Sequence, residues 1–549
     1  MSVNNIINNN SVFVQDINNI LHSEGIEFSK RLDLILEYIN NIIYKKKIIT
    51  KINEQTEKKI LDIIKSVTIN YNEIFQILFM FYCNKKHKIN LDQYYTPYTI
   101  GEFITKLMLP NKKLIDPACG TGDLVKNYIG DITLWDICPN VLEICEQNYK
   151  LNNKKVQIEC LNSLFKHDKN NNYYDYCVLN PPFGSSTIIS DKKVLDNYSL
   201  GKNKKKEEVG LLFIERSINL VVENGYVFII VPNGYLGNCT KNVIQLKNYL
   251  LSFKIIAIIE LPSNSFSRSG TGVSTSILIL QKITTDMNYN IYIKKIKNIG
   301  YTLNKKNTPH KYKMVDGKHI TRDNKPILDN DLEDCYNELI TFNYIEKLSN
   351  IKSVNNIIDY EILNVKNIEN KILDINRYLN LYKNVLNNKT NNKKIKHFII
   401  KDDDKFIKND SKEYIYLDIK QITSPIYNKN NLLFGYDLPG RAKIKLRKYD
   451  IIVSRLKGKI SFSIILDDID NIVCTNGFCL LRPVDYKNAL ILFANLFTND
   501  FVIQHNSLCT GSIMETISDT ELKNININED IDFKKYENII KALEVINNL

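Results

Sequence analysis

A short motif, Asn-Pro-Pro-Phe at residues 180–183, follows directly on the hydrophobic run YDYCVL. An ordinary turn needs one proline or an Asn-Gly pair, whereas two prolines remove two backbone donors and stiffen the chain. The amide oxygen of Asn180 and the carbonyl oxygen of Pro181 can accept hydrogen bonds from an exocyclic amino group, and Pro182 helps to fix that carbonyl. Phe183 offers a ring on which an extruded base can stack. The motif predicts a site that holds a reacting amine, with a proline turn as the structural alternative.

A glycine-rich turn lies upstream, in the stretch KLIDPACGTGDLV at residues 113–125. An apolar strand leads into this turn and a helix follows it. Ligands of doubly wound sheets bind at the carboxyl ends of strands, and glycine lets the backbone approach them closely. The stretch matches neither G-x-G-x-x-G nor a phosphate loop. Its candidate cofactor-binding residues are Asp116, Pro117, Ala118, Gly120 and Gly122.

A second carboxylate, Asp136, ends the next apolar run, DITLWD. A carboxylate at this place suits two ribose hydroxyls, and the carboxylate of Asp116 suits a cationic amino group. The pair predicts a nucleoside cofactor without a pyrophosphate, and S-adenosylmethionine fits because it joins adenosine to an α-amino acid through a sulfonium. The amine held by the Asn-Pro-Pro-Phe motif would then be a methyl acceptor. An ordinary strand-to-helix turn is the alternative.

Short apolar runs alternate with amphipathic helices from about residue 93 to residue 285, which predicts a mostly parallel α/β sheet. The expected strands cover 113–118, 131–137, 156–161, 175–180, 225–232, 254–261 and 274–282. A strand pair is expected within residues 291–307. We expect a helical domain at 1–92, a catalytic domain at 93–310, a helical connector at 311–395 and an α+β domain at 396–549.

The bulk composition narrows the class of protein further. The formal charge of +12 favours a polyanionic partner without proving one. The 11 cysteines include no C-x-x-C pair, so no zinc site or disulfide framework is expected. The first residues lack the pattern of a signal peptide, and no apolar run reaches membrane-spanning length. We expect a cytoplasmic protein.

These motifs together resemble the amino-group DNA methyltransferases, in particular the adenine-specific modification subunits of type I and type IIG restriction systems. The resemblance covers most of the chain and keeps the family order, with cofactor motifs before Asn-Pro-Pro-Phe. It implies a Rossmann-like fold dependent on S-adenosylmethionine. The stretch DQYYTPYTIGEFITKLM at 92–108 looks like the family segment before the glycine turn, so Thr96 and Pro97 would border the methionine end of the cofactor.

Two further positions follow from the same resemblance. The stretch LPSNSFSRSGTGVSTSILIL at 261–280 looks like the family's late strand region, and Phe266 would line the target-base pocket and contact DNA. Asn162 stands where the family commonly carries an aspartate near the adenine ring. Its amide oxygen can still accept a hydrogen bond from the ring amine, although a turn or helix cap is the alternative for this residue.

The last 150 residues or so resemble the target-recognition half of type I specificity subunits, through GRAKIKLRKYDIIVSRLKGKI, NGFCLLRP and TGSIMETISDTELKNINI. The expected DNA-binding residues there are Arg441, Lys443, Arg455 and Lys457, with a solvated basic face as the alternative. The lysine-rich segment 191–208 could close over the DNA strand of a flipped nucleotide, or form a disordered surface loop.

The sequence therefore predicts site-specific methylation of adenine N6 in double-stranded DNA, with the base flipped into the Asn-Pro-Pro-Phe pocket. Two alternatives stay open: a bifunctional type IIG-like enzyme that also cleaves DNA, and methylation of cytosine N4. The basic C-terminal domain argues against methylation of a protein glutamine, and the intact cofactor loop argues against a non-catalytic DNA-binding subunit. The expected partners are DNA and either a second copy of the chain or a separate specificity or nuclease subunit.

Overall fold

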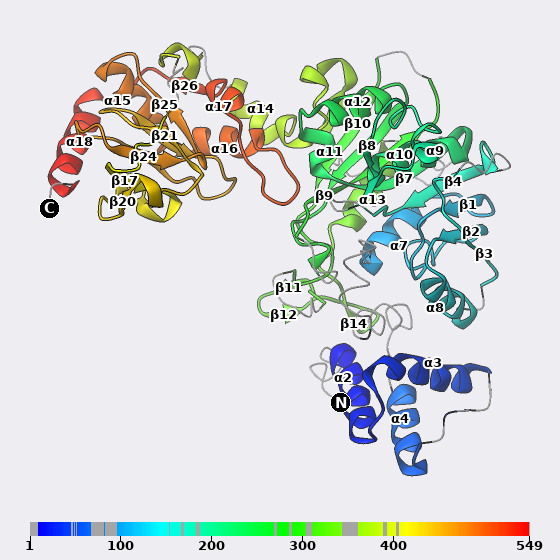
Figure 1. Cartoon of the computed structure of the whole chain (residues 1–549). Helices are drawn as coiled ribbons and strands as arrows, with labels where there is room; N and C mark the ends of the chain where they lie inside the picture. Colours follow the sequence, from blue (N-terminus) through cyan, green and yellow to red (C-terminus); the bar gives the residue numbers. More distant parts are fainter. Residues whose placement is uncertain are drawn as a thin grey trace. The chain divides into compact units, whose positions relative to one another are not determined.

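The chain is described here from a computed structural model, in which two units are distinguished. The described residues are 9–44, 48, 50, 52–66, 82, 96–152, 154–165, 170–182, 187–267, 272–284, 288–303, 310–342, 361–387, 392–401 and 406–547. Unit 1 is Met1–Leu373 and unit 2 is Asp374–Leu549. Each is described by itself (Figure 1). The finer domain boundaries expected from the sequence stay predictions.

Unit 1 is built on a nine-stranded sheet in the order β15-β10-β8-β9-β7-β4-β1-β2-β3. Its strands are β1 (Lys113–Asp116), β2 (Asp131–Asp136), β3 (Gln157–Cys160), β4 (Tyr174–Leu179), β7 (Val221–Pro232), β8 (Lys254–Glu260), β9 (Thr275–Gln281), β10 (Asn290–Lys295) and β15 (Glu361–Asn364). Neighbours run parallel except that β9 is antiparallel to β7 and β8, and β15 is antiparallel to β10. The predicted α/β sheet is confirmed, as are all seven expected strands.

Helices cover this sheet, which explains why its strands read as continuous apolar runs rather than alternating ones. In β7, for example, every residue from Val227 to Pro232 is buried. The helices that follow or precede the strands are α7 (Tyr98–Lys106), α8 (Pro139–Leu151), α10 (Val209–Leu220), α11 (Asn233–Gly237), α12 (Lys241–Leu250) and α13 (Leu332–Thr341) (Figure 1). The buried core lies between them and the sheet.

The strand pair expected within residues 291–307 is not formed as a local hairpin in the part of it that the structure describes. β10 pairs instead with β8 on one side and β15 on the other. Its residues Ile291, Tyr292 and Ile293 are all fully buried. Consecutive side chains of a strand point to opposite faces, so β10 is buried on both faces, whereas a hairpin on the surface would expose one.

The start of unit 1 is helical, as the sequence predicts. The helices α2 (Asn9–Ser23), α3 (Phe28–Tyr44) and α4 (Glu54–Ser66) share a core that includes Ile17, Ile35 and Ile60. The apolar stretch at 71–82, which also reads as a helix, lies outside the described residues except for Tyr82. None of the helices in the described ranges is long and apolar enough to cross a bilayer.

The two largest sheets in the described part of unit 2 have four and three strands, with helices beside them. One sheet has the order β20-β17-β24-β21 and the other β23-β22-β25. Their strands are β17 (Glu413–Leu417), β20 (Leu432–Phe434), β21 (Ala442–Lys445), β22 (Ile451–Ser454), β23 (Phe462–Ile464), β24 (Ile472–Thr475) and β25 (Phe478–Leu481), and the longer helices are α15 (Tyr486–Asn495), α16 (Asn499–Leu508) and α18 (Phe533–Asn547).

A buried ion pair fixes the turn between β21 and β22. Arg482 Nε donates to Asp450 Oδ1 at 3.0 Å, and its Nη2 donates to Oδ2 at 2.9 Å. The backbone amide of Arg447 donates to the same carboxylate at 2.8 Å. Because both charged side chains are buried, this pair holds the basic segment around β21 in one conformation.

Candidate active site

Three sequence-predicted residues meet at one edge of the sheet because β2, β1 and β4 are parallel neighbours. β1 ends at Asp116, β2 at Asp136 and β4 at Leu179, directly before Asn180. The carboxyl ends of adjacent parallel strands open onto the crevice where α/β proteins bind ligands. The fold therefore brings the two carboxylates and the amide together, as the sequence order suggests.

The two glycines of the turn after β1 are needed for different reasons. Both have positive φ, +53° at Gly120 and +78° at Gly122, where a side chain is unfavourable. A Cβ on Gly122 would lie 2.6 Å from both Cys145 Sγ and Tyr149 Cε2 of α8, so this glycine allows helix and turn to pack. A Cβ on Gly120 would meet no atom within 4 Å, so this glycine borders the open space where a ligand can approach the backbone.

Asp136 holds the glycine turn in place. Its Oδ2 accepts a hydrogen bond from the amide of Gly120 at 2.9 Å, and its Oδ1 accepts one from the amide of Cys138 at 2.9 Å. Burial raises the pKa of this carboxyl, and hydrogen bonds from the backbone amides of Cys138, Gly120 and Ile137 oppose the rise. A carboxylate can accept about four hydrogen bonds, so capacity remains for a hydroxyl of the ribose expected beside Asp136.

Asp116 is a buried carboxyl, with only 1% of its surface exposed. The amide of Ala118 donates to its Oδ1 at 3.1 Å. Burial raises its pKa to about 8, although the Ala118 amide opposes the rise, and the nearby charge of Asp136 raises the pKa further. A cationic group beside it would favour the charged form, so this carboxyl suits the amino group of an amino-acid tail.

Asn180 is oriented by a residue far away in the sequence. Its Nδ2 donates to Thr96 Oγ1 at 3.2 Å, across 84 residues. Thr96 directly precedes Pro97, the residue before α7, and that helix is fixed by a hydrogen bond of 2.7 Å from Thr99 Oγ1 to the carbonyl of Ile299. Because Nδ2 is committed to Thr96, the amide presents Oδ1 as its acceptor.

The prolines after Asn180 lie against the start of α10. Pro181 is buried and Pro182 is half-buried. A Cβ on Gly210 would lie 3.4 Å from the Pro182 carbonyl oxygen and 2.7 Å from Tyr235 Oη, so glycine permits this close packing. Phe183 lies outside the described residues, and its role in base stacking stays a prediction.

The residues after β3 form a turn tied to the glycine loop. Asn162 Oδ1 accepts a hydrogen bond from the amide of Leu164 at 3.0 Å, which is the turn role considered as its alternative. Ser163 Oγ donates to the carbonyl of Pro117, and Arg216 Nε donates to the carbonyl of Ser163 at 2.9 Å. The sequence did not predict roles for Ser163 and Arg216. The one signal for Arg216 was the presence of a charged residue in the otherwise apolar helix α10.

Phe266 differs from its expected role. Its side chain is 1% exposed and belongs to the main core of unit 1, together with Leu261 and Ile277. The turn at 262–267 directs the ring inward, with Ser265 Oγ donating to the carbonyl of Pro262 at 2.6 Å. In this structure the ring packs in the core instead of lining a surface pocket.

The lysine-rich segment 191–208 is ordered, which excludes the disordered loop considered as its alternative. It contains the short helix α9 (Lys192–Leu195). The buried carboxylate of Glu215 accepts hydrogen bonds from the amides of Ser199 and Leu200 at 2.7 and 2.9 Å. The segment thus presents its exposed lysines from a fixed backbone.

The four expected DNA-binding residues of unit 2 fall into two pairs. Arg441 and Lys443 are exposed at β21, and Arg441 forms an ion pair with Asp418 at 3.2 Å. Arg455 is instead tied to Asp519, at 2.6 Å, and Lys457 to Glu515.

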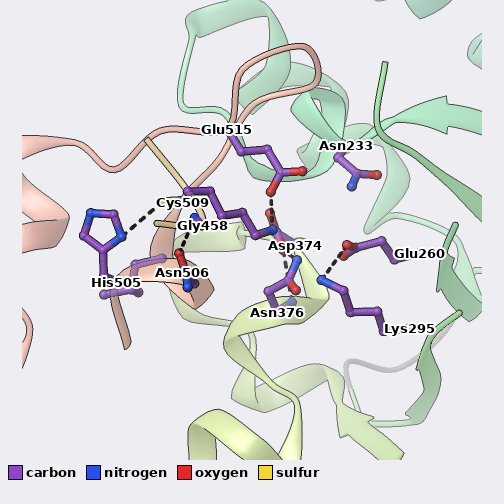
Figure 2. A network of polar contacts seen from close by, with 12 residues as sticks. Asn233, Glu260, Lys295, Asp374, Asn376, Gly458, His505, Asn506, Cys509 and Glu515 are labelled. Carbon is purple, nitrogen blue, oxygen red and sulfur yellow. Dashed lines mark hydrogen bonds and ion pairs between the residues drawn. The ribbon is translucent and has the colours of Figure 1, made fainter. Parts of the chain in front are cut away.

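The loops that carry this second pair are joined at their bases. Figure 2 shows Gly458 beside Asn506, whose Oδ1 accepts a hydrogen bond from the Gly458 amide at 2.8 Å. Cys509 Sγ also lies 3.8 Å from the carbonyl oxygen of Arg455. Arg455 and Lys457 therefore stabilise the fold around these loops, and exposure favours Arg441 and Lys443 as contacts for another molecule.

The chain resembles known proteins in both sequence and fold. Residues 71–361 match the model of the family described as N-6 DNA Methylase. No curated protein sequence matches the chain.

Among solved structures, a class I S-adenosylmethionine-dependent methyltransferase from Listeria monocytogenes is 20% identical, with 52% of this chain and 90% of that chain covered and a TM-score of 0.41. The type I restriction-modification methyltransferase subunit from Streptococcus thermophilus is 16% identical, covering 68% and 80%, with a TM-score of 0.39. The type IIG restriction endonuclease BpuSI is 13% identical, covering 98% and 72%, with a TM-score of 0.49.

The sheet order and the ligand-binding edge define a Rossmann-like methyltransferase that depends on S-adenosylmethionine. The family match covers more than half of the chain, and the chain belongs to the N-6 DNA Methylase family. It is an adenine-specific DNA methyltransferase.

Proposed function

We propose that the chain methylates adenine N6 within a specific sequence of double-stranded DNA, with the target base extruded into a pocket beside Asn180. The observation that carries this proposal is the hydrogen bond between Asn180 Nδ2 and Thr96 Oγ1, at the edge of the sheet where β1 and β2 also end. It orients an amide acceptor beside the carboxylates that suit the cofactor. The cofactor-binding residues would be Thr96, Pro97, Asp116, Pro117, Ala118, Gly120, Gly122, Asp136 and Asn162.

Each side chain has a distinct part in this mechanism. S-adenosylmethionine supplies an electrophilic methyl group. Asn180 Oδ1 and the Pro181 carbonyl accept hydrogen bonds from the adenine amino group, which directs its lone pair toward the methyl group and stabilises the positive charge that develops on nitrogen. The rigid prolines keep the carbonyl in position, so little reorganisation is needed. No general base is required, because the amine releases its proton after it has become cationic.

We assign sequence recognition to unit 2. Its exposed cations at β21, Arg441 and Lys443, are supported by their exposure and by the rigid turn that Asp450 and Arg482 stabilise. Groove-facing arginine and lysine side chains can read guanine edges or contact phosphates. One recognition unit is visible in the sequence, so a divided target would require a second copy of the chain or a separate subunit.

The test is to express the chain in a host without DNA methylation and to sequence the modified bases of its DNA. The expected result is N6-methyladenine within one recurring sequence motif. Arg441→Ala and Lys443→Ala together should weaken or relax the choice of motif while methylation itself persists. Methylcytosine, or DNA without any modified base despite folded protein, would refute the proposal.

Protons should be released when the cofactor binds. Because the pKa of Asp116 is raised to about 8 by burial, this carboxyl is mostly protonated at pH 7, and a cationic ligand beside it favours the ionised form. Affinity should therefore increase as the pH rises toward 8. Calorimetry in buffers with different ionisation enthalpies measures the released protons, and Asp116→Asn should release fewer than the wild type. The amino group of the ligand titrates in both proteins and cancels in the comparison. Equal proton release would contradict the assignment.

A further inference from the structure

The catalytic turn, residues 180–182, is followed by a segment that is fastened to the start of α10. The short strands β5 (Ile188–Ile189) and β6 (Glu207–Glu208) pair antiparallel. The amide of Val209, the first residue of α10, donates to the carbonyl of Thr187 at 3.0 Å. The chain that leaves the sheet at the end of β4 is therefore held again by β6 and α10.

Glu207 anchors this second attachment through a buried carboxylate. Asn242 Nδ2 of α12 donates to Glu207 Oε1 at 2.8 Å, and the Glu208 amide donates to the same oxygen at 2.9 Å. Lys204 pairs with Oε2. Charge-assisted hydrogen bonds of this kind are stronger than neutral ones, so Glu208 extends its side chain from a firmly held backbone.

Tyr235 reaches Glu208 from a different element. It lies on α11, which follows β7, and β7 is the parallel neighbour of β4. Its Oη donates to Glu208 Oε2 at 2.8 Å. Burial raises the pKa of the Tyr235 phenol well above its ordinary value, and the charge of Glu208 raises it further. The hydroxyl therefore stays protonated at neutral pH and keeps its role as a donor.

Gly210 brings the Tyr235 hydroxyl close to the catalytic turn. A Cβ on Gly210 would lie 2.7 Å from Tyr235 Oη and 3.4 Å from the carbonyl oxygen of Pro182. The hydroxyl and the carbonyl therefore both border the small space that the absent side chain leaves at the start of α10. Interiors packed this closely transmit displacements, so a shift of Tyr235 would be felt at Pro182.

We infer that Tyr235 and Glu208 are positioning residues, whose hydrogen bond holds the Pro181 carbonyl in the geometry that methyl transfer requires. This inference rests on the proposed function and deepens it. The hydrogen bond joins α11 to the residue before α10, and so fixes the surface against which Pro182 packs. Because transfer depends on the alignment of the amine lone pair with the methyl group, a small displacement of the carbonyl slows it strongly.

The test compares the wild-type chain with Tyr235→Phe in single-turnover methylation of a duplex that contains the motif methylated by the wild type. The rate of transfer should fall by about 10-fold, because the catalytic turn loses its fixed support. The KM for DNA and the affinity for S-adenosylmethionine should stay the same, because the lost alignment matters only in the transition state. Calorimetry should find as much cofactor bound per chain as in the wild type, which excludes partial unfolding.

Further variants separate positioning from a general loss of stability. Tyr128→Phe removes another hydrogen-bonded hydroxyl, which donates to the Leu109 carbonyl at 2.9 Å and accepts from the amide of Lys112, just before β1. This change lies at the opposite end of the strands and should leave the rate unchanged. Glu208→Gln keeps an acceptor oxygen and should retain most of the rate, whereas Glu208→Ala should lose as much as Tyr235→Phe. The double variant Tyr235→Phe/Glu208→Ala should lose no more than either single variant, because both remove the same hydrogen bond.

Three outcomes would overturn the inference: a wild-type rate in Tyr235→Phe, an equal loss of rate in Tyr128→Phe, or single losses at Tyr235 and Glu208 that add up in the double variant. The last outcome would mean that the two side chains act separately. The proposed function fails in a different experiment, if the wild type leaves DNA unmethylated.

Discussion

Replacing Asn180 with alanine is expected to abolish methyl transfer while binding of S-adenosylmethionine is retained. The change removes the amide oxygen that stabilises positive charge on the attacking nitrogen, and the loss of one such polar group typically lowers kcat by about 10²–10³-fold. The side chain of Asn180 donates to Thr96 and is assigned to the adenine rather than to the cofactor. Its removal should therefore leave the affinity for S-adenosylmethionine unchanged. Transfer of a labelled methyl group to DNA measures the first effect, and calorimetry measures the second.

The Thr96 hydroxyl provides the matched control. Thr96→Val keeps the shape of the side chain but removes the acceptor for Asn180 Nδ2, whereas Thr96→Ser keeps it. We expect kcat to fall in Thr96→Val, by less than in Asn180→Ala, and to recover in Thr96→Ser. Turnover that stays at the wild-type level in Asn180→Ala would remove the residue from the mechanism.

The second large effect is expected for Asp136→Ala, which should raise the dissociation constant of S-adenosylmethionine by about 100-fold, since hydrogen bonds to a charged group contribute about 1.5–3 kcal/mol each. The substitution removes the acceptor for the ribose hydroxyls. It also releases the amides of Gly120 and Cys138, which the carboxylate holds at 2.9 Å, so the glycine turn loses its fixed conformation.

Asp131 is a suitable control for this experiment because it begins the strand that Asp136 ends. Its side chain is exposed, so Asp131→Ala should leave the dissociation constant unchanged. Calorimetry of both variants, with thermal unfolding as a check on folding, separates a local effect from a general one. If Asp136→Ala bound the cofactor as tightly as the wild type, the ribose would have to be held elsewhere.

Much of the fold of unit 1 could be predicted from the sequence because its strands are buried on both faces. A continuous apolar run such as VFIIVP is typical of a strand that helices cover on both faces of the sheet. Glycines and prolines mark the turns after β1 and β4. β10 was the exception. Its apolar residues indicated a strand but could not identify its partners, because β15 follows about seventy residues later and joins it only in the folded chain.

The parts of the site that the sequence did not reveal depend on tertiary contacts. Neither Thr96 nor Asn180 carries any local sign that their side chains meet, and the tie from Ser163 to Pro117 joins single residues without a motif. Phe266 is as apolar as a stacking residue would be, so only its burial distinguishes the two roles.

The roles of the basic residues in unit 2 also depend on tertiary contacts. The sequence shows the positive charges but not the partners that Arg455 and Lys457 find within the same unit.

The hydrogen bond between Asp136 and the Gly120 amide also has a consequence for product release. The turn is shaped by the protein itself, so the groups that we propose to contact the nucleoside are in place before anything binds. Those contacts do not sense the transferred methyl group, and such uniform interactions stabilise reactant and product alike. The demethylated product should therefore bind about as tightly as the donor and compete with it, so the ratio of donor to product would limit the rate of modification.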